Sequence, residues 1–160
     1  LSMKTTIFLG AMLSLLVCLM FTGCSNSETN STSRGLTDFA HIEEEYLATI
    51  DSLNWPDGIT LPDKLEDEDT GASFQVGYGE TRASYLWEYS WMKEWLDTYN
   101  TDPERAEKAL EELEKAFDMP YMGIDRCDDA TRNYLRENID KAKLGDPSGF
   151  TESIRANYAN

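Results

Sequence analysis

The sequence predicts an all-α fold, a small bundle of about five helices over residues 37–160. Apolar residues recur at spacings of three and four in each long segment, and capping or turn residues separate these segments. No alternating apolar pattern is long enough to indicate a strand. The chain has 160 residues, of which 41% are hydrophobic, so one domain can bury a real core.

The first helix is expected to begin after Thr37 or Asp38, because either side chain can cap it. Its apolar residues have helical spacing: Phe39, Ile42, Tyr46, Ile50 and Leu53. The Trp-Pro-Asp-Gly sequence at 55–58 is turn chemistry that ends it. The loop of about 20 residues that follows, to Gln75, is long for a compact domain, so we expect it to be functional, mobile or partly helical.

The second helix is expected near Glu80 to Tyr99 and is unusually rich in aromatic residues. From residue 78 to 99, seven of 22 residues are aromatic: Tyr78, Tyr85, Trp87, Tyr89, Trp91, Trp95 and Tyr99. At 100° per residue, the apolar positions cover roughly half to two-thirds of the helix. Such a wide face is typical of a central helix whose aromatic residues form the core. The alternative is a binding groove, for which the candidate residues are Tyr85, Glu88, Trp91 and Trp95.

Three further helices are predicted from their start and stop signals. Asp-Pro-Glu at 102–104 provides a cap followed by proline at the first helical position, and Pro120 is expected to stop that third helix. A fourth helix is expected from about Asp128 to Leu144, with Gly145 as its terminator. Asp-Pro at 146–147 is expected to start a short last helix.

Glu88 falls in the middle of the aromatic face of the second helix. A carboxylate in such a place must be paired, hydrogen-bonded or protonated, and Arg126 and Arg132 are the candidate partners for a structural ion pair. The alternative is a general acid that acts on cell-wall glycan. Glu88 resembles the helix-borne Glu of lytic transglycosylases, but the Glu-Ser pair and the downstream Gly-x-Met-Gln of that family are absent. We therefore predict no catalytic residue and no enzymatic activity.

Charge and residue counts exclude several classes of function. The chain carries 14 basic and 30 acidic residues, a net charge of -16 at pH 7, which argues against a nucleic-acid partner. One histidine and three cysteines are too few for a zinc site, and no Gly-rich phosphate loop or Gly-x-Ser-x-Gly elbow is present. We expect no metal and no cofactor.

Three other features each have a plain interpretation. His41 is expected at the surface or at a helix cap. The acidic stretch at 67–71 matches a calcium loop poorly, since Gly71 and Tyr78 fall at ligand positions, so a solvated loop is expected and weak cation binding is the alternative. Cys127 is expected to be partly buried and inert, with an intermolecular disulfide as the alternative.

The N-terminal segment has the features of a signal peptide. A weakly positive Met3-Lys4 precedes a 15-residue apolar run from Ile7 to Phe21. A helix of this length spans roughly 22 Å, which is short of a ~30 Å hydrocarbon core. The run ends in Phe-Thr-Gly-Cys at 21–24 and resembles a bacterial lipoprotein signal, with residues 1–23 as the signal peptide. The resemblance implies acylation of Cys24; the alternatives are an uncleaved anchor or an ordinary secretory signal.

Residues 24–36 are predicted to be the lipidated cysteine and a flexible tether, since 25–35 contain no large apolar residue. This places the domain on the extracytoplasmic face of a cell membrane, or on an outer membrane if the host is Gram-negative. The lipid anchor makes the membrane one partner, although the acidic domain should be repelled by anionic lipids. The acidic surface also suits a cationic envelope protein or a wall component. The expected function is therefore binding, and sequestration of a cationic toxin is a second possibility.

Four short motifs in the predicted domain resemble those of small secreted bacterial proteins with no assigned activity. They are Trp-Pro-x-Gly at 55–58, Gly-Tyr-Gly-Glu at 77–80, Trp-x-x-x-Trp at 87–91 and Gly-Asp-Pro at 145–147. This resemblance is loose and implies a fold more than a function.

Overall fold

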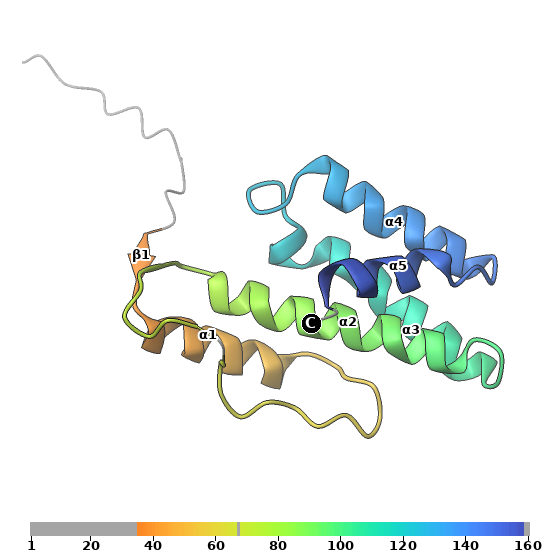
Figure 1. Ribbon diagram of the computed structural model, residues 1–160, viewed down its shortest axis with the longest axis horizontal. Coiled ribbons are helices and arrows are strands. Elements are labelled where there is room, and N and C mark those ends of the chain that lie inside the picture. The colour runs from red at the N-terminus through yellow and green to blue at the C-terminus, as the bar shows by residue number, and fades with distance from the viewer. Residues whose placement is uncertain (1–34, 67, 159–160) are drawn as a thin grey trace, which may run out of the picture. The chain divides into compact units, whose positions relative to one another are not determined.

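The computed structural model describes residues 35–66 and 68–158. The predicted signal peptide, Cys24 and the tether up to residue 34 lie outside this part. Within it, the chain forms five α-helices, two short 3-10 helices and a pair of two-residue strands (Figure 1). The prediction of a small, mainly helical domain is confirmed.

Helix α1 (Phe39–Ser52) begins where the sequence predicts. The Asp38 side chain caps it by accepting a hydrogen bond of 3.0 Å from the backbone N–H of His41. The helix turns one face to the interior through Ile42, Tyr46 and Ile50, which are all buried. The predicted apolar stripe therefore forms the contact between α1 and its neighbour α2.

Two strands were not expected. β1 (Leu36–Thr37) pairs in antiparallel fashion with β2 (Phe74–Gln75), so that Leu36 lies opposite Gln75. A two-residue strand is too short for an alternating pattern to reveal it, because that signal needs about four to eight residues. Leu36, which the sequence analysis places in the tether, is thus already joined to the domain through its backbone.

The segment between α1 and β2 contains no helix among its described residues, yet it is anchored at two points. The Leu65 side chain is buried against α1, in the same cluster as Ile50. Near α1, the indole N–H groups of Trp87 and Trp91 both donate to the carbonyl oxygen of Asn54, at 2.8 and 3.1 Å. The loop is therefore a packed part of the domain at these positions.

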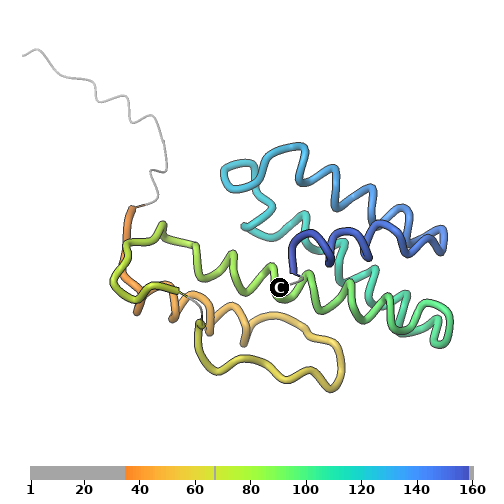
Figure 2. Tube along the Cα trace, in the orientation of Figure 1, coloured from red at the N-terminus to blue at the C-terminus, as the bar shows by residue number. Residues whose placement is uncertain are grey.

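Helix α2 (Tyr78–Thr98) is the centre of the domain, as its wide aromatic face predicts. It packs against α1 on one side and against α3 and α5 on another (Figures 1 and 2). It begins two residues earlier than expected, after Gly77, which has a φ of 88°. The main core cluster surrounds its Trp87, Trp91 and Trp95.

Helix α3 (Pro103–Glu114) starts at the predicted proline, and Asp102 caps it through the N–H of Arg105 at 3.2 Å. The α-helical part ends earlier than predicted and continues into two 3-10 helices, η1 (Lys115–Asp118) and η2 (Pro120–Met122). Pro120 explains the break between them, because the residue before a proline is disfavoured in the α conformation, and Met119 is extended.

Helix α4 (Asp129–Lys143) lies within one residue of its predicted bounds, and α5 (Ser148–Asn157) begins directly after the predicted Asp-Pro start. Asp128 caps α4 through the N–H of Thr131 at 2.8 Å. Gly145, with a φ of 79°, follows the end of α4 and lets the chain turn into α5. The two helices pack against each other, and α5 also packs on α2.

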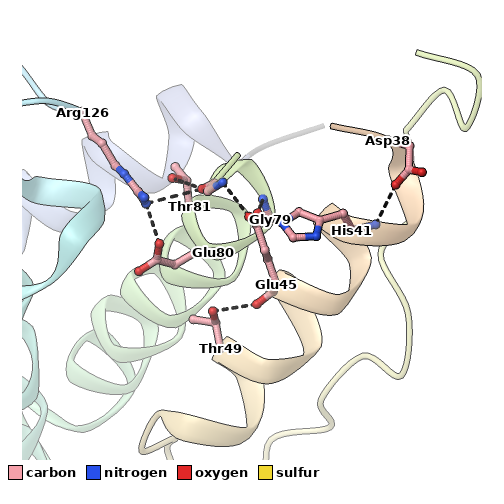
Figure 3. A network of polar contacts seen from close by, with 9 residues as sticks. Asp38, His41, Glu45, Thr49, Gly79, Glu80, Thr81 and Arg126 are labelled. Atoms are coloured by element: carbon pink, nitrogen blue, oxygen red, sulfur yellow. Dashed lines mark hydrogen bonds and ion pairs between the residues drawn. The ribbon is translucent and has the colours of Figure 1, made fainter. Parts of the chain in front are cut away.

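The junction between α1 and α2 depends on Glu45, whose carboxylate accepts from the backbone N–H groups of Gly77 (2.7 Å) and Gly79 (3.2 Å) (Figure 3). Gly77 offers no side-chain cap, so a residue of another helix supplies it. Gly79 is required by the close approach, because a Cβ there would lie 1.8 Å from the Ile42 carbonyl oxygen. We call this region the α1–α2 junction.

Candidate functional site

A hollow of about 900 Å³ lies along α2, lined by the 62–66 segment, α1, α4 and the end of α5. Five tyrosines and one buried acid give it its chemical character. We call it the tyrosine cavity; these residues are Tyr46, Tyr85, Tyr89, Tyr134, Tyr158 and Glu88. Two of the four residues that the sequence proposes for a groove, Tyr85 and Glu88, therefore lie here.

Glu88 lines this cavity although only 7% of its surface is exposed. Its Oε2 accepts a hydrogen bond of 2.6 Å from the hydroxyl of Tyr121. Its Oε1 accepts none from residues 35–66 or 68–158. In that part of the chain, every fully buried side-chain oxygen has a hydrogen-bond partner. Because Oε1 has none there, it is not fully buried and can reach the solvent of the cavity. One oxygen of the carboxyl group is thus held, and the other is open.

Burial changes the acid strength of Glu88. Removal from water disfavours the charged form, and this raises its pKa to about 7, against the opposing effect of the Tyr121 hydrogen bond. Near neutral pH the group exists in both forms, so it can carry a negative charge, donate a hydrogen bond or transfer a proton.

Aromatic rings enclose the acid from several elements. The rings of Tyr85 and Tyr121 meet edge to face with centroids 5.6 Å apart, and those of Tyr89 and Tyr158 are 5.0 Å apart. Tyr85 is 40% exposed and forms part of the rim. The Tyr158 hydroxyl donates to the carbonyl oxygen of Tyr85 at 3.4 Å, which ties the end of α5 to α2.

The other charged side chains in the lining are already paired. Lys64 contacts Glu66 at 2.8 Å, and Arg82 forms an ion pair with Glu68. Among the described residues that line the cavity, Glu88 is thus the one charged group without an opposite charge. When Glu88 is ionised, the charges of the lining balance, and Glu68, which pairs with Arg82 from outside the lining, makes the surroundings of the cavity negative by one charge.

The prediction that Glu88 forms an ion pair with Arg126 or Arg132 is wrong. Arg126 pairs instead with Glu80 at 2.6 Å, and Arg132 pairs with Asp129 and donates to backbone carbonyl oxygens. The actual partner, Tyr121, comes from η2. Its only signal in the sequence is that it follows the helix-stopping Pro120, which does not indicate where its hydroxyl points.

The two tryptophans proposed for the groove lie in the core. Trp91 is 1% exposed and Trp95 is 2% exposed, and neither lines the tyrosine cavity. Trp95 stacks on Tyr99 and borders a separate, smaller hollow of about 450 Å³ between α2, α3 and the end of α4. For these residues the core interpretation is the one that the structure supports.

The remaining candidate residues have plain surroundings. His41 is exposed and lies 3.2 Å from Glu45. Cys127 is a partly exposed free thiol, and burial raises its pKa. Over residues 35–66 and 68–158, no three His, Cys, Asp or Glu side chains are placed to hold a metal ion, although Asp67 of the acidic stretch lies outside. No helix in the same residues is long and apolar enough to cross a membrane.

The chain matches no protein-family model, no curated protein and no solved structure.

Proposed function

We propose that this chain is a lipid-anchored binding module on the extracytoplasmic face of a bacterial cell membrane, where it binds a cationic protein of the envelope. The anchor rests on the signal-like sequence that ends at Cys24. The binding role rests on one observation above all, the unpaired Glu88 carboxyl group in a tyrosine-lined cavity of a strongly acidic chain. Sequestration of a cationic toxin is one form that this role can take.

Two physical effects support a cationic partner. The net charge of -16 attracts basic proteins over a distance and raises their association rate. At contact, a carboxylate without a counter-charge gains from a cation that approaches through the cavity, since the carboxylate has already lost most of its water.

A glycan hydrolase is the second candidate function. It is favoured by the pKa of Glu88, which at about 7 suits a general acid. A second carboxylate at a catalytic distance is what most glycosidases need. The other acid in the lining, Glu66, belongs to the pair with Lys64, so this candidate stands second.

Crosslinking on intact cells, followed by mass spectrometry of the captured proteins, tests the binding role. We expect basic envelope proteins, and we expect their capture to weaken with salt, because the Debye length falls from about 8 Å at physiological ionic strength to about 3 Å at 1 M. Capture of no basic protein would contradict the proposal. Release of soluble fragments from purified peptidoglycan, lost in Glu88→Gln, would favour the hydrolase.

Membrane fractionation tests the anchor. Cys24→Ala removes the acylated thiol, so the protein should remain unprocessed or leave the membrane fraction. Cys127→Ala is the matched control and should fractionate like the wild type. A Cys24→Ala protein that still fractionates with membranes at the mature mass would refute the lipoprotein interpretation.

A further inference from the structure

We propose that the tyrosine cavity binds an alkylammonium group, the side chain of a lysine on the cationic partner, with the ammonium placed beside Oε1 of Glu88. This inference deepens the proposed function and rests on it for the source of the lysine. It assigns the cavity a ligand class, a contact atom and a set of surrounding side chains.

The charged side chains that line the cavity favour a positively charged ligand. Lys64 and Arg82 each have a glutamate beside them, so an anion would have to compete with that glutamate for either cation. Among residues 35–66 and 68–158, no lysine, arginine or histidine forms an ion pair with Glu88, and its Oε1 accepts no hydrogen bond. A ligand that brings both a positive charge and an N–H donor to Oε1 meets both needs.

The shape of the charge favours ammonium over guanidinium. A guanidinium group binds best as a fork to both oxygens of a carboxylate. In Glu88, Oε2 already accepts from the Tyr121 hydroxyl at 2.6 Å, so a fork to both oxygens would have to share Oε2 with that hydroxyl. An ammonium is a compact charge that can use one oxygen.

The tyrosines complete the site for such a ligand. Tyrosine rings attract cations through their π faces, and rings grouped in a cage are a known means of binding alkylated ammonium groups. Tyr85, Tyr89 and Tyr158 line the cavity with Glu88, and Leu86 and Leu135 add apolar surface for the methylene chain. Glu88 thus provides the charge, and the rings provide a lining for the rest of the side chain.

Titration of the amine-binding site can be assigned to one group. The titratable groups that interact electrostatically with Glu88 are Tyr85, Tyr121, Cys127 and Tyr158, and burial raises the pKa of each above its ordinary value. Glu88, whose pKa is raised to about 7, is therefore the member of this group that titrates between pH 5.5 and 8. An ammonium should bind the ionised form, so its affinity should fall about tenfold for each pH unit below that pKa.

The experiment is a calorimetric titration of the full chain, purified from membranes in neutral detergent, with Nα-acetyl-lysine methylamide. The norleucine analogue, which has a similar chain without the ammonium, and the arginine analogue are the comparison ligands. We expect the lysine analogue to bind, the norleucine analogue to bind at least tenfold more weakly, and the arginine analogue to lie between them. Equal affinity for lysine and norleucine analogues would overturn the inference.

Variants locate the site. Glu88→Gln keeps an acceptor for Tyr121 but loses the charge, so the affinity should fall at least tenfold and lose its dependence on pH. Glu152→Gln removes the same charge from an exposed position of α5 and should change affinity less than twofold. Tyr85→Ala alters a half-exposed ring, should fold normally and should weaken binding about fivefold. Binding that is unchanged in both Glu88→Gln and Tyr85→Ala would also overturn the inference.

The outcomes separate this inference from the proposed function. If basic proteins are captured on cells but the lysine analogue does not bind, the partner uses another surface and the cavity assignment fails. If the analogue binds at Glu88 but no basic protein is captured, the cavity assignment stands and the proposed function fails.

Discussion

Two glutamates of this domain, Glu45 and Glu88, show how differently a fold can treat the same side chain. Glu45, which is partly buried, accepts from two backbone N–H groups at the start of α2 and lies 3.2 Å from His41. Glu88, 7% exposed, accepts from a single tyrosine hydroxyl. The first carboxylate faces the positive end of a helix dipole, whereas the second faces a cavity lined with tyrosines.

The two carboxylates have different surroundings and satisfy different numbers of donors. At the α1–α2 junction the charge of Glu45 satisfies donors that have no other cap, so it serves the fold. In the tyrosine cavity the charge of Glu88 satisfies one donor and leaves an oxygen open, at a cost in desolvation that raises the pKa of the group to about 7. An acid kept at such a cost is a candidate functional residue.

The largest expected effect comes from breaking the α1–α2 junction at Gly79. In Gly79→Ala the new Cβ would lie 1.8 Å from the Ile42 carbonyl oxygen, so the two helices must move apart. We expect the free energy of unfolding to fall by about 3 kcal/mol or more, the upper end for overpacked sites. Urea denaturation measures it. Gly35→Ala, where a Cβ meets nothing within 4 Å, is the control, and an equal loss in both variants would contradict the close-packing argument.

The next largest effect comes from Glu88→Gln in the tyrosine cavity. At high pH this substitution should raise the free energy of unfolding, whereas Gly79→Ala lowers it. The folded-state pKa of Glu88 is raised from 4.5 to about 7, so its stability contribution is complete below pH 4.5 and is lost as the pH rises toward 7. At pH 8 the loss is about 3 kcal/mol, from the 1.36 kcal/mol that each pKa unit represents. Glu88→Gln cannot ionise, so it should be the more stable protein at pH 8.

Urea denaturation of wild type and Glu88→Gln at pH 5, 6, 7 and 8 checks this prediction. The difference in unfolding free energy between the two proteins should change mainly between pH 5 and 7 and level off toward pH 8, while Glu152→Gln should follow the wild type. A constant difference would show that Glu88 titrates at an ordinary pKa and is better solvated than the structure indicates.

A smaller loss is expected when the cap of α2 is removed. Glu45→Ala leaves the N–H groups of Gly77 and Gly79 without their acceptor, so the unfolding free energy should fall by about 1–2 kcal/mol. Glu44→Ala removes an exposed acid one position earlier on α1 and should cost much less. Thermal unfolding of the two variants gives the comparison. Equal melting temperatures would mean that water replaces the carboxylate as the cap.

The smallest effect should come from Arg126, which contacts Glu80 at 2.6 Å and the carbonyl oxygen of Gly77 at 3.5 Å (Figure 3). This ion pair is partly exposed, so Arg126→Gln should cost about 1 kcal/mol or less. Because Arg126 does not pair with Glu88, the pH profile of the variant should match that of the wild type. A shift in that profile would contradict this prediction, because it would indicate that Arg126 interacts with Glu88, as the sequence suggested.

The local features of this fold could be predicted because they depend on neighbours in the chain. Asp38 and Asp102 cap the helices expected of them, and Asp128, at the expected start of α4, caps it too, each through an N–H three residues away. The central place of α2 followed from the width of its apolar face. The pairing of Leu36 with Gln75 could not be predicted, since two residues carry no periodic signal.

Only part of the candidate site could be predicted, because the rest depends on contacts between residues that are distant in the sequence. Glu88 and Tyr85 share a turn of α2, so a helical wheel places them together. Whether the tryptophans of that face are buried depends on what covers them, and α3 and α5 pack against α2 from distant parts of the chain. The partner of Glu88 is 33 residues away, beyond the range of any helical wheel.

By itself, the sequence determined the helices, the Asp38 and Asp102 caps, the acidic charge of -16 and the presence of one acid on an apolar face. It also contains the lipoprotein-like signal, which stays a prediction. Only the tertiary structure decided that Glu45 caps α2 and that Glu88 meets Tyr121 instead of an arginine. Helix formation and the aspartate caps depend on contacts within three or four residues, whereas the Glu45 cap and the environment of a buried charge are set by the elements that pack around them.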